Sequence, residues 1–177
     1  SCISYISNYF EKEVDQEVLM IIESEKKELP LKFKTQYLLD KRYVGEDKGE
    51  AIHPQFFDSN VWYLSEKEKN KTRLFFLNRG IYQKTGFLEC KKCKRIIVLD
   101  SFGRMFAGKV RTAHFHHSSF LSGGPVSSAG EIDIENGVIV GISNQSGHYS
   151  PDMEGLFRIL EVLLENNQPV PIRLSFY

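Results

Sequence analysis

The hydrophobic positions near the start of the chain recur with the spacing of an α-helix. Within residues 8–28, Val14, Val18 and Ile21 lie three or four positions apart among glutamates and lysines. This spacing predicts a charged amphipathic helix that packs one apolar stripe. Proline does not continue a helix, so we expect Pro30 to end it.

The next part of the chain combines a short helical pattern with two polar segments. Residues 34–42 predict a second helix. The segments 45–54 and 65–72 are polar, and we interpret them as a loop and a solvated connection. We divide the chain into an N-terminal helical segment, residues 1–33, and a single domain, residues 34–177.

Beyond residue 73 the apolar residues come in short runs or alternate with polar ones, as they do in β-strands. Residues 74–77 and 96–99 are such runs, and residues 101–103 predict a turn between strands. Residues 131–142 hold two strand patterns separated by the pair Asn136-Gly137. Because both residues of a tight hairpin turn must tolerate positive φ, this pair predicts a β-hairpin.

The last part of the chain predicts one helix and a final strand. Ser150, Pro151 and Asp152 offer a helix cap and a first turn, and an apolar stripe with helical spacing follows. Residues 169–177 predict the strand. Helices followed by a β-rich half indicate an α+β domain with a mostly antiparallel sheet, N-terminal helices and one late amphipathic helix.

Charge and hydropathy exclude some classes of protein. The 23 basic and 23 acidic residues cancel, which argues against a protein that grips nucleic acid by its phosphates. No apolar run approaches the roughly 20 residues of a membrane span, and no signal-peptide pattern is present. We therefore expect a cytosolic protein with no nucleic acid partner and no membrane span.

The three cysteines do not make a disulfide framework. Cys90 and Cys93 form one CxxC pair, whereas a structural zinc site needs four ligands. We interpret the pair as two incidental thiols in a surface turn, in a protein of a reducing compartment.

The residues that carry chemistry concentrate in segment 114–154, which holds four of the five histidines. A metal site would need most of these histidines, but a strand would turn His117 away from His114 and His116. Nucleophilic catalysis would need a serine activated by a histidine, but no GxSxG elbow is present. A structural role, with serines capping turns and rings filling the core, is the alternative for every one of these residues.

A site for NAD fits the composition of this segment best. ADP-ribosyl transfer needs polar groups on the nicotinamide ribose, an aromatic ring on nicotinamide, and a glutamate that stabilises the developing positive charge. The predicted catalytic residues are His117, Tyr149, Glu131 and Glu154. The predicted NAD-binding residues are His116, His117, Ser118, Ser119, Phe120, Gly123, Gly124, Ser146 and His148. A second arrangement stays open, with Arg42 or Arg79, then Ser118 or Ser119, then Glu154 or Glu161.

Three strings in this segment resemble a known family. Residues 117–124 (HSSFLSGG), 129–130 (AG) and 146–151 (SGHYSP) follow the order of HSSFLAGG, AAG and SGHYRP in the conserved domain of the plant IQ-motif-containing (IQM) calmodulin-binding proteins. A looser similarity extends over residues 37–170. The chain is also similar to C-terminal domains of bacterial effectors and polymorphic toxins, some of them suspected ADP-ribosyltransferases.

The resemblance implies two functions. One is a mono-ADP-ribosyltransferase-like effector or toxin domain that is secreted into a host cytosol and modifies a protein of that eukaryotic cell. The alternative is a non-catalytic protein-interaction module of the calmodulin-linked IQM type. The IQ motif of the plant proteins is not found in the 177 residues, so calmodulin would bind through a region outside this chain.

Overall fold

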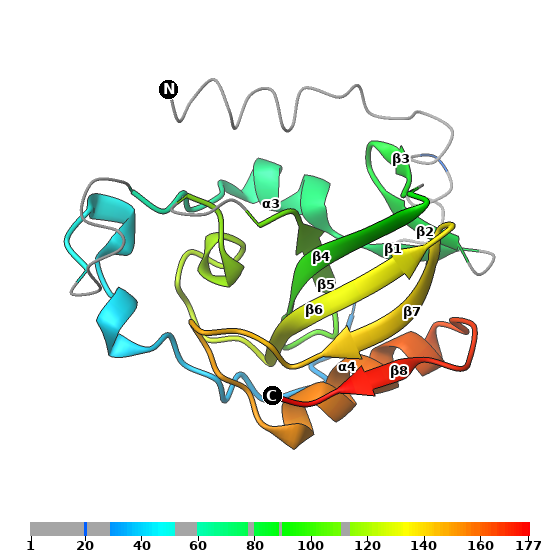
Figure 1. Ribbon diagram of the computed structural model, residues 1–177. Coiled ribbons are helices and arrows are strands. Elements are labelled where there is room, and N and C mark those ends of the chain that lie inside the picture. Colours follow the sequence, from blue (N-terminus) through cyan, green and yellow to red (C-terminus); the bar gives the residue numbers. More distant parts are fainter. Residues whose placement is uncertain (1–19, 21–28, 52–59, 78–79, 89, 111–113) are drawn as a thin grey trace.

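The computed structural model describes residues 20, 29–51, 60–77, 80–88, 90–110 and 114–177. Almost all of the predicted helix at 8–28, and with it most of the segment 1–33, lies outside the described residues. The described part is an α+β structure with a five-stranded sheet, a smaller three-stranded sheet and one long helix (Figure 1), which confirms the predicted fold class.

The five-stranded sheet has the order β5-β4-β6-β7-β8. Its centre is made by the two longest strands, β4 (Lys92–Leu99) and β6 (Ser128–Glu135), which pair along their whole length. On the outside lie β5 (Met105–Gly108) and β7 (Val138–Ser143), both antiparallel to their neighbours, and then β8 (Arg173–Ser175). The pair β7–β8 is parallel because a helix crosses between the two strands.

Both predicted turns are confirmed. Asn136 and Gly137 join β6 to β7 with φ of 50° and 76°, which is the left-handed conformation that such a turn requires. The turn at 101–103 joins β4 to β5, and the Asp100 carboxylate accepts hydrogen bonds from the backbone N–H groups of Phe102 and Arg104.

The smaller sheet follows a short helix that was not predicted. The strands β1 (Phe75–Leu77), β2 (Gly80–Gln83) and β3 (Gly86–Phe87) form an antiparallel meander. Before them lies α3 (Glu66–Thr72), so the interpretation of residues 65–72 as a connection was wrong. The Ser65 and Glu68 side chains each accept from the other residue's backbone N–H, a capping box that starts the helix despite its charge.

The predicted helix at 34–42 is also wrong. The backbone N–H and C=O of Tyr37 both bond to Val126, at 3.1 and 3.0 Å, so this segment runs as an extended chain beside the loop that precedes β6. Only the end of the predicted range is helical, as the single 3-10 turn η1 (Lys41–Tyr43), which is followed by η2 (Glu46–Lys48). Tertiary hydrogen bonds to the backbone override a weak local preference here.

The long helix α4 (Met153–Glu165) covers one face of the five-stranded sheet (Figure 1). Its first turn is capped by Asp152, two residues later than the predicted cap at Ser150. Leu156, Ile159 and Leu163 of α4 are buried in one cluster with isoleucines of β6 and β7. In the described part of the chain no helix has both the length and the apolar composition to span a bilayer.

Among the described residues, the loop before β6 covers half of the opposite face of the sheet. Phe115 and Phe120 from the loop before β6 pack on Val98 of β4 and Ala129 of β6. The other half of this face carries charged side chains, including Lys94 of β4. The loop that covers the apolar half is the segment with the predicted site.

Candidate functional site: a buried glutamate–histidine cluster

The first of the three strings folds as a tight turn under the surface. His117–Ser119 form the 3-10 turn η4, in which the His116 N–H donates to the Ser119 hydroxyl at 3.0 Å. Gly123 has φ of 72°, and a Cβ at that position would lie 2.6 Å from the Tyr63 hydroxyl oxygen. Only glycine therefore allows both the turn and the close approach of Tyr63.

Glu46 lies at the centre of the site and is fully buried. Its carboxylate accepts from His148 Nε2–H at 2.8 Å and from the Tyr63 hydroxyl at 3.0 Å. Burial favours the neutral acid, but these donors and the neighbouring Ser118 hydroxyl hold the pKa of Glu46 below its usual value. The carboxylate is therefore ionised at neutral pH, with its charge satisfied inside the protein.

Aromatic rings enclose His148. The ring of Tyr43 stacks on His148 with centroids 3.9 Å apart, and the His116 ring stacks at 4.9 Å. Burial and the proximity of His148 lower the pKa of His116 to about 4. His116 is thus uncharged at neutral pH.

His117 points to the sheet instead of to Glu46. Its Nε2–H donates to the backbone carbonyl of Gly130 at 2.7 Å, and burial lowers its pKa to about 4. Tyr149 is also buried, and its hydroxyl donates to the carbonyl of Gly124 at 2.8 Å. These two bonds attach the strings at 117–124 and 146–151 to β6 and to each other.

The two predicted catalytic glutamates have partners elsewhere. Glu131 lies on β6 and pairs with Lys94 at 3.1 Å, on the face of the sheet that carries charges. Glu154 is exposed in the first turn of α4 and pairs with Arg158 at 3.1 Å. In the alternative arrangement, Arg42 pairs with its neighbour Asp40, and Arg79 is outside the described residues. Of the predicted site residues, His148 and Ser118 contact Glu46, and His116 joins this cluster by stacking on His148. The two predicted catalytic glutamates are not part of it.

The histidines weighed as metal ligands serve as hydrogen-bond and stacking groups. The ring of His114 stacks on Trp62, and its Nδ1 lies 3.1 Å from the Asn60 carbonyl oxygen. Among the described residues no group of three or more histidine, cysteine or carboxylate side chains is placed to hold a metal ion.

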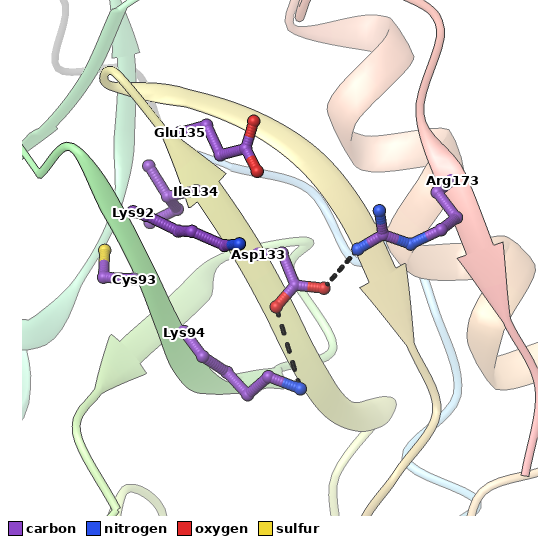
Figure 2. Close-up of a pocket in the computed structure, with 7 residues that line it drawn as sticks. All are labelled: Lys92, Cys93, Lys94, Asp133, Ile134, Glu135 and Arg173. Atoms are coloured by element: carbon purple, nitrogen blue, oxygen red, sulfur yellow. Dashed lines mark hydrogen bonds and ion pairs between the residues drawn. The ribbon is translucent and has the colours of Figure 1, made fainter.

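A cavity of about 450 Å3 lies on the charged face of the sheet (Figure 2). Asp133 lies in it between Arg173, at 2.8 Å, and Lys94, at 3.7 Å. Lys92 and Glu135 line the same cavity. None of the residues predicted to bind NAD is among its lining residues.

Sequence reasoning missed Glu46, Tyr43 and Tyr63. Glu46 lies in a polar segment rich in glycine that was interpreted as a loop, and one acidic residue there looks like any other. The partners of Glu46 are 17 and 102 residues away in the chain, so no local spacing connects them.

Residues 81–156 match the family model of the IQ motif-containing protein middle domain. The chain is related to the IQM proteins. It is 44% identical over 126 residues to IQ domain-containing protein IQM3 of Arabidopsis thaliana. The aligned region covers 68% of this chain and 28% of that protein.

Two further relatives from Arabidopsis thaliana give the same result. IQ domain-containing protein IQM2 is 36% identical over 95 residues, covering 54% of this chain and 16% of that protein. IQ domain-containing protein IQM1 is 29% identical over 128 residues, covering 70% of this chain and 26% of that protein. The chain therefore spans less than a third of the length of these relatives. No solved structure matches it.

These comparisons confirm one part of the resemblance and contradict another. The similarity to the IQM conserved domain is confirmed. The interpretation as an ADP-ribosyltransferase, and as an effector or toxin of virulence, was wrong, because the relatives are plant IQ domain-containing proteins and no comparison links the chain to effectors or transferases. The NAD site and the cytosolic location stay predictions.

Proposed function

We propose that this chain is a non-catalytic protein-interaction module of the calmodulin-linked IQM type. The observation that carries the proposal is the match to the IQM middle domain over residues 81–156, which contains all three strings. The strings build a closed cluster, in which Glu46, Ser118 and Phe120 have no exposed surface. A dinucleotide needs a concave site of several hundred Å3, whereas this cluster suits the task of holding surface loops in place.

The loops that the cluster holds present a surface with exposed apolar residues. We define the loop surface as Leu38, Val44, Gln145, Gly147 and Ser150, all of them exposed. The Asp40 N–H donates to the His148 carbonyl at 2.8 Å, which joins the segment of Leu38 and Val44 to the string SGHYSP. Loops on a rigid scaffold commonly carry binding residues, and aliphatic side chains among polar ones suit a protein partner.

Calmodulin enters this proposal through the family. The relatives are described as IQ domain-containing proteins, and we propose that calmodulin binds through residues outside this chain. Titration of isotope-labelled calmodulin with the chain, with and without Ca²⁺, should leave the calmodulin amide spectrum unchanged. Shifted resonances would locate a calmodulin site within the 177 residues and contradict this part of the proposal.

The module is tested with two matched valine variants. Val44 in the loop surface is 62% exposed, and Val170, in the loop before β8, is 69% exposed. We expect the wild-type chain and Val170→Glu to enrich the same proteins from an Arabidopsis extract, and Val44→Glu to lose them. Equal recovery by Val44→Glu would exclude the loop surface, and label transfer from NAD to protein would contradict the non-catalytic assignment.

A further inference from the structure

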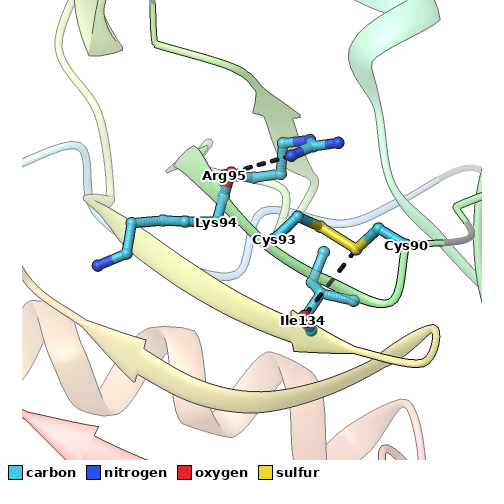
Figure 3. Close-up of a disulfide and its surroundings, with 5 residues drawn as sticks. All are labelled: Cys90, Cys93, Lys94, Arg95 and Ile134. Carbon is cyan, nitrogen blue, oxygen red and sulfur yellow. Dashed lines mark hydrogen bonds between the residues drawn. A yellow bond between two sulfur atoms is a disulfide. The ribbon is translucent and has the colours of Figure 1, made fainter.

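A disulfide joins Cys90 and Cys93 at the start of β4 (Figure 3). This bond shows that the interpretation of the pair as two incidental thiols is wrong. Both cysteines are half-buried and pack against the core on the side of α4. Their sulfur atoms therefore contact the protein interior on one side, while part of each residue stays accessible to solvent.

The disulfide lies in a strongly basic stretch. Four of the five residues 91–95 are lysine or arginine, and the fifth is Cys93. Lys91 and Lys92 are exposed, and Arg95 lies two residues after Cys93, on the same side of β4. Positive charges stabilise a thiolate over a thiol, and a stabilised thiolate is a better leaving group when a disulfide is attacked.

The loop between the cysteines holds the turn of the neighbouring hairpin. The carbonyl of Lys91 accepts from the Asn136 N–H at 3.1 Å, and the carbonyl of Cys90 accepts from the Gly137 N–H at 3.4 Å. The disulfide closes this loop, so it restrains the two carbonyls that hold the turn.

We propose that Cys90–Cys93 is a reversible thiol–disulfide exchange site for a small thiol or dithiol, and that its redox state controls how firmly the hairpin turn is held. A thiolate of the reductant attacks one sulfur, the Cys90–Cys93 bond breaks, and a mixed disulfide forms while the second cysteine leaves as thiolate. A second reductant thiolate then attacks the reductant sulfur of the mixed disulfide and releases the first cysteine. Two electrons pass to the protein, its two thiolates take up the protons that the reductant thiols give up, and the reductant becomes a disulfide.

The disulfide lies at one end of the cavity of Figure 2, whose lining includes Cys93. Lys92 lies between the two cysteines, pairs in register with Glu135 across β4 and β6, and lines the cavity together with it. When reduction releases the loop at residues 90–93, the cavity residues at this end lose their restraint. Reduction therefore changes the shape of the cavity as well as the hold on the turn.

The test begins with the thiols themselves. The variant Cys2→Ser, which keeps only the CxxC pair, is equilibrated in buffers with increasing ratios of reduced to oxidised glutathione, alkylated and weighed by mass spectrometry. We expect both cysteines to become alkylated together in one transition within these ratios. A chain that stays fully oxidised in a large excess of reduced glutathione would overturn the exchange site.

Amide hydrogen exchange tests the consequence for the hairpin. Reduction should speed exchange of the Asn136 and Gly137 amides by about tenfold or more, because their acceptors lose their restraint. The amide of Gly103, in the turn at the other end of β4, serves as the internal control and should not change. Unchanged hydrogen exchange at Asn136 and Gly137 would overturn the proposed redox control of the turn. The double variant Cys90→Ser/Cys93→Ser should show the exchange rates of the reduced chain, and adding the reductant should not change them.

Discussion

Glu46 shows how one buried charge can organise distant loops. It is fully buried and accepts from His148 and Tyr63, which lie on two different segments, beside the Ser118 hydroxyl of a third. A buried carboxylate is costly unless donors satisfy it. The cluster is therefore stable only when all these loops are in place, which makes Glu46 a sensitive position for mutation.

We expect Glu46→Gln to lower the free energy of unfolding by about 1–3 kcal/mol, because Tyr63 and His148 donate to different carboxylate oxygens and the amide nitrogen that replaces one of them would face a donor in a buried site. Urea denaturation of the variant and the wild-type chain measures the difference. Glu50→Gln is the matched control, since Glu50 is exposed in the same segment and should change stability by less than about 0.5 kcal/mol. Equal stability of all three chains would contradict the role of Glu46.

The histidines of the site predict a loss of stability in acid. The pKa values of His116 and His117 in the folded chain are about 4, against an ordinary value of 6.5. Below pH 6.5 these two histidines bind protons in the unfolded chain but stay neutral in the folded chain. The free energy of unfolding therefore falls as the pH drops from about 6.5 to about 4. Below that range Glu46, whose pKa is also lowered, adds to the loss.

Melting temperatures measured between pH 7 and pH 4 test this slope. The variant His117→Gln keeps a donor for the Gly130 carbonyl and does not titrate, so its melting temperature should fall less steeply than that of the wild-type chain. Parallel profiles for the two chains would show that His117 is not the source of the acid sensitivity.

At the scale of single elements, the β6–β7 hairpin depends on its glycine. Gly137 has φ of 76°, and a Cβ there would lie 2.7 Å from the ring of Phe87. We expect Gly137→Ala to destabilise the chain by about 1 kcal/mol or more, through backbone strain and the displaced ring. Gly147→Ala is the control, because the added Cβ would meet only Tyr43 at an ordinary 3.7 Å, and comparable losses in both variants would contradict the explanation.

The helix α3 depends on its cap in the same way. It has only seven residues, all of them polar or charged and only Thr72 buried, and Ser65 caps it. Ser65→Ala should cost about 1 kcal/mol in unfolding free energy. Lys67→Ala, at an exposed position inside the helix, should be neutral, and circular dichroism during urea denaturation compares the two.

At the scale of the whole molecule, Arg158 connects three parts of the chain. Its guanidinium lies on α4 and donates to the backbone carbonyls of Lys34 and Ser127, each at 3.0 Å, and to Gln36 at 2.8 Å. The helix, the first extended segment and the start of β6 are thus fixed to one another by one buried side chain.

Removal of this side chain should weaken the whole fold. We expect Arg158→Ala to cost about 2–4 kcal/mol, because it removes the donor to the buried carbonyl of Ser127 and to the partly buried carbonyl of Lys34. Glu154→Gln, which changes only the exposed partner of Arg158 on the same helix, should change the unfolding free energy by less than about 0.5 kcal/mol. If Glu154→Gln lowered the unfolding free energy as much as Arg158→Ala, the ion pair with Glu154 would account for the effect of Arg158. The hydrogen bonds of Arg158 to the backbone carbonyls would then not be its main contribution.

The sequence by itself determined those elements whose signal is local. The turn at Asn136-Gly137, the strands around it and the apolar stripe of α4 were predicted because positive φ, alternation and helical spacing are properties of neighbouring residues. The order of the three strings likewise indicated the IQM relatives. The capping box of α3 is also a local signal, but the segment was interpreted from its charge alone and the box was not predicted.

Only the tertiary structure decided what the predicted site is. Nothing near Glu46 in the chain distinguishes it from the other 22 acidic residues, and its partners come from segments up to 102 residues away. The same reason explains why residues 34–42 are extended, since Tyr37 bonds to Val126 instead of to its own helix. Burial, hydrogen bonding and the pKa of an acid or a histidine depend on what surrounds it in space, and the fold alone sets those surroundings.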